Sequence, residues 1–212
     1  MRQQRKPLTL WVVLGSLLLM SFPEVSQAGE PLDKIRQTVD DVLTILADTS
    51  LKTPERTQDR RAKIRQAVLQ RFGFDEMAQR SLGRHWRQRT PAERQEFVAL
   101  FSDLLERSYI DKIETYAAGQ QKVRYTKETI DKEGYAVVRS EIVSERDLNV
   151  EIEYRLLQRD GNWSVYDVII EGVSLISNYR TQFNKIILES SFADLLKKMK
   201  LKLEQEKAAT QS

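Results

Sequence analysis

Cysteine and histidine, two residue types that many enzymes use in catalysis and metal binding, are scarce in this chain. It has no cysteine and one histidine, His85, which excludes cysteine nucleophiles, disulfides and histidine clusters that bind a metal. His85 stands between Arg84 and Trp86, a setting more typical of a packing or surface residue than of a catalytic base. The chain contains no G-x-S-x-G nucleophile motif and no glycine-rich phosphate loop. We therefore predict no catalytic residue, no metal site and no enzymatic activity.

Carboxylates offer the remaining route to acid–base chemistry. Glu151 and Glu153 lie two residues apart on an expected strand and so share one face. Arg155 continues that face while apolar residues occupy the other, which indicates a solvated outer surface. Asp167 lies inside another expected strand, and it is the candidate that an enzyme would need there.

A group of four arginines is the main concentration of charge. Arg80, Arg84, Arg87 and Arg89 surround an expected helix end. The simpler interpretation is a solvated helix terminus with favourable charge near the negative end of the helix dipole. The functional alternative is a docking patch for an acidic partner or an anionic head group.

The first 28 residues have the pattern of a secretory signal peptide. Arg2, Arg5 and Lys6 precede an apolar run over 8–22, and Ser26-Gln27-Ala28 supplies the small residues of a cleavage site. An uncleaved anchor is the alternative, but a run of about 15 residues is short for a span of about 20. Cleavage would lower the formal charge from +3 to about +1, which gives no reason to expect a nucleic-acid partner. We expect a soluble domain over 29–212, with a frayed tail over 204–212.

Helical periodicity dominates the first half of this domain. Apolar residues recur every three or four positions over 31–50, 59–71, 75–82 and 91–117. Thr90, Pro91 and Glu93 form a capping box at the start of the last of these helices.

Alternation with a period of two then predicts four strands over 122–130, 135–143, 148–157 and 163–170. Because short links join them, neighbouring strands should be antiparallel. In the fourth strand, Val165 and Val168 fall on opposite parities, so a bulge near Asp167 is needed to bring both to one face. A sharp turn at Gly172 and an N-cap at Ser174 should begin a helix over 175–190, and Ser191 should cap another.

This order predicts an α+β fold with N-terminal helices, a four-stranded antiparallel twisted sheet and C-terminal helices. The helices should close over one face of the sheet. The space beneath the helices is either a filled core or an elongated apolar cavity, and both remain open at this point.

Several motifs together resemble those of the MlaC family, also called the toluene-tolerance family. The similarity covers essentially the whole chain after residue 28 and is most specific over 161–183. The motifs are Phe72-x-Phe74-x-x-Met77-Ala78, Leu82-Gly83-x-x-Trp86, Thr90-Pro91-x-x-Arg94-x-x-Phe97, Phe101, Tyr109, Gly161-Asn162-Trp163-x-x-Tyr166-Asp167-Val168-x-x-Glu171-Gly172-Val173-Ser174-Leu175 and Asn178-Tyr179-Arg180-x-Gln182-Phe183.

The resemblance implies a periplasmic phospholipid carrier that moves lipids between the outer and inner membranes. The implied partners are an inner-membrane ABC transporter complex with an MCE-type protein, and an outer-membrane lipoprotein–porin complex. It implies no cofactor, since phospholipid is the cargo, and no catalysis. Acyl chains would enter an apolar pocket between the sheet and the helices, with the head group largely outside.

On this basis we predict which side chains contact lipid. The pocket lining should be Phe101, Leu104, Leu105, Ile142, Val150, Ile152, Tyr154, Val165, Val168, Ile170 and Val173. Tyr179 and Arg180 either stand at the pocket mouth or lock the corner after the fourth strand by hydrogen bonds.

Two other classes of protein remain as alternatives. One is a periplasmic chaperone or adaptor that binds apolar protein segments in an open groove. The other is an enzyme for a small apolar substrate, with Asp167 as its acid or base.

Overall fold

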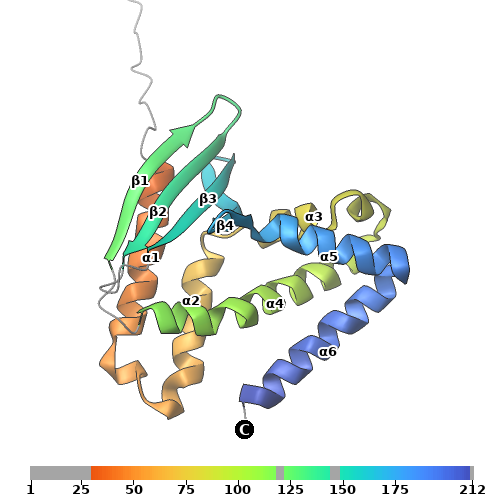
Figure 1. Ribbon diagram of the computed structural model, residues 1–212, viewed down its shortest axis with the longest axis horizontal. Coiled ribbons are helices and arrows are strands. Elements are labelled where there is room, and N and C mark those ends of the chain that lie inside the picture. The colour runs from red at the N-terminus through yellow and green to blue at the C-terminus, as the bar shows by residue number, and fades with distance from the viewer. Residues whose placement is uncertain (1–29, 118–121, 144–148, 211–212) are drawn as a thin grey trace, which may run out of the picture.

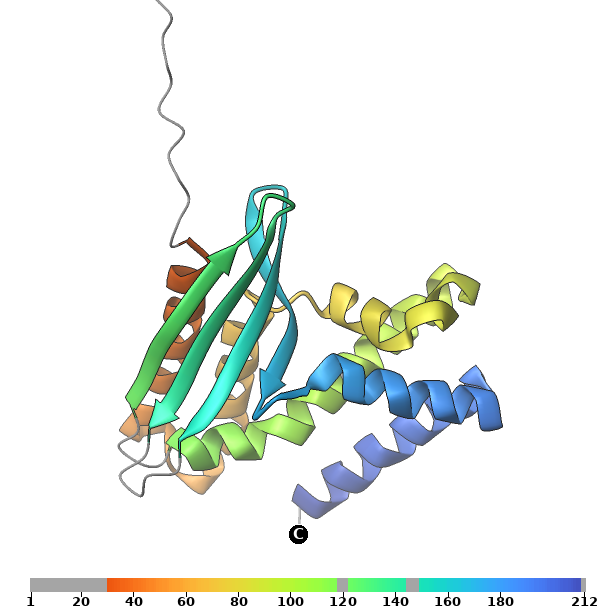
Figure 2. The same cartoon turned by 45° about the horizontal axis from the view of Figure 1, so that its top comes forward.

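The structure is a computed structural model that describes residues 30–117, 122–143 and 149–210. The signal-peptide pattern lies outside these residues. In the described part, α1 (Glu30–Ala47) and α2 (Thr57–Leu69) lie beside a twisted sheet, whereas α3 (Phe74–Leu82), α5 (Leu175–Glu189) and α6 (Phe192–Thr210) form a helical layer to its side. The long helix α4 (Pro91–Ala117) runs beneath both parts (Figures 1 and 2). Short 3-10 segments at Thr49–Leu51 and Pro54–Arg56 join α1 to α2, and one at Gly83–Gln88 joins α3 to α4.

The sheet is antiparallel, as predicted, but it has five strands instead of four. The strands β1 (Lys122–Ile130), β2 (Tyr135–Val143), β3 (Val150–Arg159), β4 (Asn162–Ile170) and β5 (Val173–Ser174) are hydrogen-bonded in chain order. The additional strand has two residues. It forms because Glu171 and Gly172 both adopt positive φ angles, 49° and 76°, which return the chain so that Ile170 pairs with Val173.

The bulge expected in the fourth strand is present. Leu156 pairs with Val165 and Arg155 pairs with Asp167, so Tyr166 is the extra residue on β4. The bulge moves Val168 onto the same face as Val165, and both are buried. The ambiguous parity of the sequence is therefore resolved by one inserted residue.

Local hydrogen bonds define the helix starts that the sequence predicts. The backbone N–H of Thr90 donates to Glu93 Oε2 at 2.8 Å, and the Glu93 N–H donates to Thr90 Oγ1 at 3.3 Å, which completes the capping box of α4. At the start of α5, Ser174 Oγ accepts from the Ser177 N–H at 3.0 Å. The last helix, α6, continues past Glu204 to Thr210, where the sequence suggested a frayed tail. Glu, Gln, Lys and Ala, which dominate this stretch, are good helix formers.

Two hydrophobic clusters stabilise the two parts of the molecule. The helical cluster includes Phe97 and Phe101 of α4 with Phe183 of α5 and Leu195 of α6. The sheet cluster joins Ile35 of α1 to the inner face of the sheet. Phe72 and Tyr109 pack against both clusters. No helix within the described ranges is long and apolar enough to cross a membrane.

Candidate functional site

A large apolar cavity lies between the inner face of the sheet and three helices. Its volume is about 600 Å³, within the range of about 300–1,000 Å³ that is typical of small-molecule sites. The lining side chains come from α1, the end of α2, the last turns of α4 and strands β1 to β4: Ile35, Thr38, Val39, Val42, Leu43, Leu46, Val68, Phe72, Tyr109, Asp111, Lys112, Ile113, Thr115, Val123, Ile142, Val150, Ile152, Tyr154 and Ile170. We call this space the main cavity.

The apolar stripe of α1 explains part of this wall. Ile35 is 1% exposed and packs on the sheet. The stripe then continues at helical spacing through Val42, Leu43 and Leu46, which are only partly buried and line the main cavity. One end of the helix is therefore anchored in the core, whereas the other presents apolar side chains to an empty space.

Among the residues that the structure describes, charge is found only at the edge of the main cavity. Asp111 and Lys112 are its charged lining residues, and both are exposed. The Lys112 ammonium lies 5.0 Å from the centre of the Tyr109 ring. Burial raises the pKa of Tyr154, a tyrosine hydroxyl in the cavity wall. Such a wall favours hydrocarbon inside and tolerates polar groups only at the rim.

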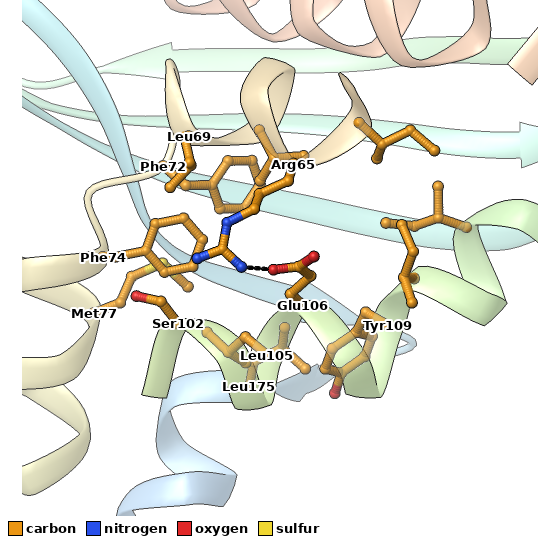
Figure 3. Close-up of a pocket in the computed structure, with 14 residues that line it drawn as sticks. Arg65, Leu69, Phe72, Phe74, Met77, Ser102, Leu105, Glu106, Tyr109 and Leu175 are labelled. Atoms are coloured by element: carbon orange, nitrogen blue, oxygen red, sulfur yellow. Dashed lines mark ion pairs between the residues drawn. The ribbon is translucent and has the colours of Figure 1, made fainter. Parts of the chain in front are cut away.

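A smaller cavity of about 130 Å³ adjoins the main one, and we call it the annex (Figure 3). Val68, Phe72, Tyr109 and Ile113 line both spaces. The remaining annex residues are Ile64, Arg65, Leu69, Phe74, Met77, Ser102, Leu105, Glu106, Ile110 and Leu175. Arg65 reaches from α2 to pair with Glu106 of α4 (Figure 3), so the two charges in the annex wall neutralise each other.

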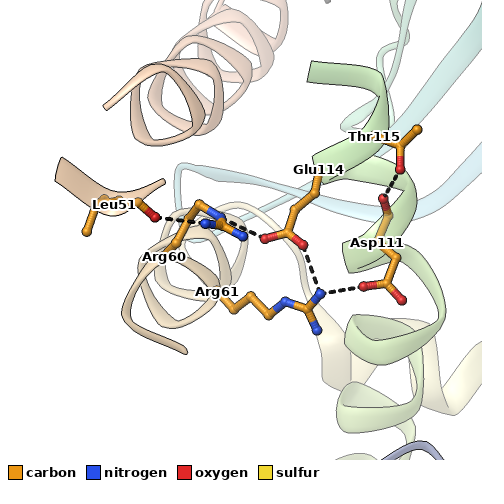
Figure 4. A network of polar contacts seen from close by, with 6 residues as sticks. All are labelled: Leu51, Arg60, Arg61, Asp111, Glu114 and Thr115. Atoms are coloured by element: carbon orange, nitrogen blue, oxygen red, sulfur yellow. Dashed lines mark hydrogen bonds and ion pairs between the residues drawn. The ribbon is translucent and has the colours of Figure 1, made fainter. Parts of the chain in front are cut away.

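Ion pairs hold α2 against α4 next to these cavities (Figure 4). Arg60 Nε donates to Glu114 Oε1, and Arg61 Nη2 donates to Glu114 Oε2, each at 2.8 Å. Arg60 also donates to the carbonyl oxygen of Leu51 at 2.7 Å. Burial raises the pKa of Glu114, but the hydrogen bonds from Arg61 and Arg60 outweigh burial, so the pKa lies below its ordinary value.

The candidate catalytic groups all have structural roles. Asp167 Oδ2 accepts from Ser174 Oγ at 2.7 Å and its Oδ1 accepts from the Ile176 N–H at 3.1 Å, so this buried carboxylate joins β4 to the start of α5. His85 is buried, with Nε2 3.0 Å from Asn184 Oδ1. In the described ranges, no group of three or more His, Asp or Glu side chains is arranged to hold a metal ion.

The expected outer face at Glu151 and Glu153 is present. Glu153 accepts from Arg139 Nε at 2.8 Å and from Arg155 Nε at 2.9 Å. These hydrogen bonds outweigh burial and lower the pKa of Glu153. The pair of carboxylates therefore belongs to a charged outer surface of the sheet.

Comparison with known proteins places this site in a family. A model of the MlaC protein family matches residues 36–201. The chain belongs to the MlaC family. The intermembrane phospholipid transport system binding protein MlaC of Haemophilus influenzae is 19% identical over 200 residues, covering 93% of this chain and 92% of that protein. A solved structure of a phospholipid-binding protein from Ralstonia solanacearum, in complex with a phospholipid, has a TM-score of 0.73 and 28% identity, covering 82% of this chain and 97% of that one.

The predicted lipid-contacting residues of this MlaC-family chain fall into three groups. Five of the eleven line the main cavity, namely Ile142, Val150, Ile152, Tyr154 and Ile170. One more, Leu105, lines the annex. The strands of the middle of the sheet therefore supply the cavity wall, as the alternation of the sequence suggested.

The other five predicted residues line neither cavity. Phe101 and Leu104 are buried in the helical cluster, because the first half of α4 packs against α3, α5 and α6. Val165 and Val168 are buried in the sheet cluster. Val173 is 57% exposed on the short strand β5. Periodicity shows which face of an element is apolar, but it does not show what that face contacts.

The structure packs Tyr179 into the helical cluster and ties Arg180 to α3. Tyr179 is buried, and its ring lies 5.4 Å from that of Phe101 in an edge-on arrangement. Arg180 Nε donates to the carbonyl oxygen of Arg80 at 2.8 Å, which ties α5 to the end of α3. Neither residue lines the main cavity or the annex.

The four arginines do not form one uniform patch. Arg80 pairs with Glu76 at 2.6 Å and stacks 4.1 Å from the centre of the Tyr166 ring. Arg89 lies 4.6 Å from the centre of the Phe192 ring. Arg84 and Arg87 are exposed, although Arg84 Nη2 also donates to Asn184 Oδ1 at 3.0 Å, so these two are the members most accessible to a partner.

Sequence reasoning missed much of the cavity wall. The apolar stripe of α1 was visible, but an amphipathic helix is usually core, and nothing local distinguishes a stripe that lines a cavity. Tyr109 and Ile113 lie on the same wide apolar face of α4 as Phe101. Only their position beyond the helical cluster makes them part of the site.

Proposed function

We propose that this protein carries phospholipid across the periplasm between the outer and inner membranes, as part of a lipid-asymmetry transport system. The main cavity is the observation that carries the proposal: about 600 Å³ of apolar space whose charged lining residues, within the described ranges, stand only at its rim. Support comes also from membership of the MlaC family and from the phospholipid in the Ralstonia solanacearum relative. The phospholipid is cargo, and the proposal requires no cofactor and no catalytic step.

The energetics suit a carrier that uses no fuel of its own. Each methylene removed from water contributes about 0.8 kcal/mol, so a dozen buried methylenes contribute on the order of 10 kcal/mol before the costs of association. A head group held at the rim stays in contact with water and adds little selectivity. Direction must then come from the membrane complexes, through differences in affinity or through an ATPase.

We assign the partners by the same proposal. An inner-membrane ABC transporter complex with an MCE-type protein and an outer-membrane lipoprotein–porin complex would exchange lipid with the cavity. The name of the Haemophilus influenzae relative, an intermembrane phospholipid transport system binding protein, supports this setting. Arg84 and Arg87 are exposed and are the proposed docking residues for an acidic surface.

The test is native mass spectrometry of the protein purified from bacterial periplasm. We expect a mass increment that matches a phospholipid. A protein that is consistently empty, and that also fails to extract lipid from vesicles, would refute the proposal. Co-purification of peptides in place of lipid would favour a chaperone or adaptor.

The enzyme alternative has a separate test. Both oxygens of Asp167 accept hydrogen bonds from the start of α5. We therefore expect Asp167→Asn to lower the stability of the fold and to have no effect on catalysis. A turnover that Asp167→Asn removes, in a variant that still binds lipid, would favour an enzyme.

A further inference from the structure

The volumes of the two cavities suggest different tasks. An apolar cavity of about 150 Å³ holds benzene, which corresponds to about 25 Å³ per carbon. At that ratio the main cavity of about 600 Å³ holds about 24 carbons, and the annex of about 130 Å³ holds about five. Two palmitoyl chains contain about 32 carbons. The main cavity alone is therefore too small for both chains, and the annex supplies most of the difference.

The side chains that separate the two cavities are only partly buried. Val68, Phe72, Tyr109 and Ile113 line both spaces, and each is only partly buried. Phe72 and Tyr109 also pack against the two hydrophobic clusters, but all four are less buried than Phe97 and Phe101, which are 0% exposed. Partly buried side chains can change rotamer without unfolding the protein, and such a change here would connect the main cavity to the annex.

One wall of the annex is formed by α2. Ile64 is the buried residue of this helix, which packs against α1 and is held to α4 by ion pairs. Arg65 pairs with both Glu106 and Asp103 across this wall. The inner surface, with Phe74, Met77 and Leu105, is apolar (Figure 3). This apolar surface suits a hydrocarbon end, whereas a charged head group would gain little there, because Arg65 and Glu106 already pair with each other.

We infer that the annex receives the terminal carbons of a phospholipid acyl chain and thereby sets the chain length that this protein prefers. The inference rests on the proposed lipid-carrier function and deepens it. Each methylene that the annex accepts improves affinity about fourfold. Lipids with long chains gain from the annex, and lipids whose chains end within the main cavity do not.

The test is to fill the annex and leave the main cavity unchanged. Ser102 lines the annex but not the main cavity, and Ser102→Phe adds five non-hydrogen atoms, which matches the estimated capacity of about five carbons. Ser102 is 9% exposed, so a large side chain there could prevent folding. Leu69→Trp is therefore a second variant, at an annex residue that is 47% exposed. Leu188→Trp, at an α5 residue that is 63% exposed and lines neither cavity, is the matched control.

Each protein is loaded from vesicles that contain equal amounts of dilauroyl- and dipalmitoyl-phosphatidylglycerol, and native mass spectrometry measures the ratio of the two bound lipids. We expect both annex variants to shift this ratio tenfold or more toward the dilauroyl lipid, with Leu188→Trp equal to the unchanged protein. Equal ratios in all four proteins would refute the annex while leaving the carrier intact. An unchanged protein that takes up neither lipid would refute the carrier function itself.

Discussion

Filling the main cavity from α1 is the sharpest test of the site. Val42 is partly buried and lines the main cavity, so Val42→Phe should place its ring in space that lipid would occupy. The change adds four carbons, or about 100 Å³ at about 25 Å³ per carbon. It should displace about four methylenes of cargo, which costs about 3 kcal/mol and weakens binding about two-hundredfold.

The same variant should leave the empty protein as stable as before. A ring that enters an empty space adds contacts, whereas overpacking a filled core costs about 1–3 kcal/mol. Val138, at 0% exposure in the sheet cluster, provides the contrast, and Val138→Phe should lower the unfolding midpoint of the empty protein. Val173→Phe, at a residue 57% exposed, should change neither binding nor stability, although the sequence placed Val173 in the lining.

Binding is measured by displacement of a fluorescent phospholipid, and stability by denaturant unfolding of the delipidated protein. If Val42→Phe binds lipid within a few-fold of the unchanged protein, the main cavity is not where the chains lie. If Val42→Phe destabilises the empty protein as much as Val138→Phe does, the space is already filled by protein.

Three further predictions concern the groups around the cavities. Asp167→Ala removes both acceptors at the start of α5 and should lower the free energy of unfolding by about 1–3 kcal/mol, as measured by urea titration. An unchanged stability would show that Asp167 does not hold β4 to α5. The pKa of Glu114 is lower than usual in the folded protein, so the folded state binds fewer protons at this group than the unfolded state does. The contribution of Glu114 to the free energy of unfolding should therefore be complete at neutral pH and lost as the pH falls below about 4. Unfolding curves of Glu114→Gln and the unchanged protein should therefore converge in acid, and a constant gap would argue against these ion pairs. The double variant Arg84→Glu, Arg87→Glu changes two exposed residues and should keep its thermal midpoint and its bound lipid while weakening association with the transport complexes in a pull-down; loss of the fold would show that these arginines are structural.

The position of the cavity follows from how α4 is shared. Its first half is buried between α3, α5 and α6, where Phe97 and Phe101 stack with ring centres 5.8 Å apart. Its last turns pass beneath the sheet, where Tyr109 and Ile113 meet the cavity. A single helix thus serves as core at one end and as cavity wall at the other, which is why Phe101 and Leu104 of α4 lie in the helical cluster and not in the lining.

The sequence by itself determined the elements of this protein. Helical and strand periodicity, the capping box at Thr90 and the turn at Gly172 depend on neighbours a few residues away, and the structure places the long helix and most strands where they were expected. The bulge in β4 could also be predicted, because apolar residues at both odd and even positions of one strand share a face only if a residue is inserted between them. The tertiary structure alone decided that the space under the sheet is hollow. That outcome depends on how far α1 and α4 stand from the strands, and an apolar stripe reads the same whether it faces protein or an empty cavity.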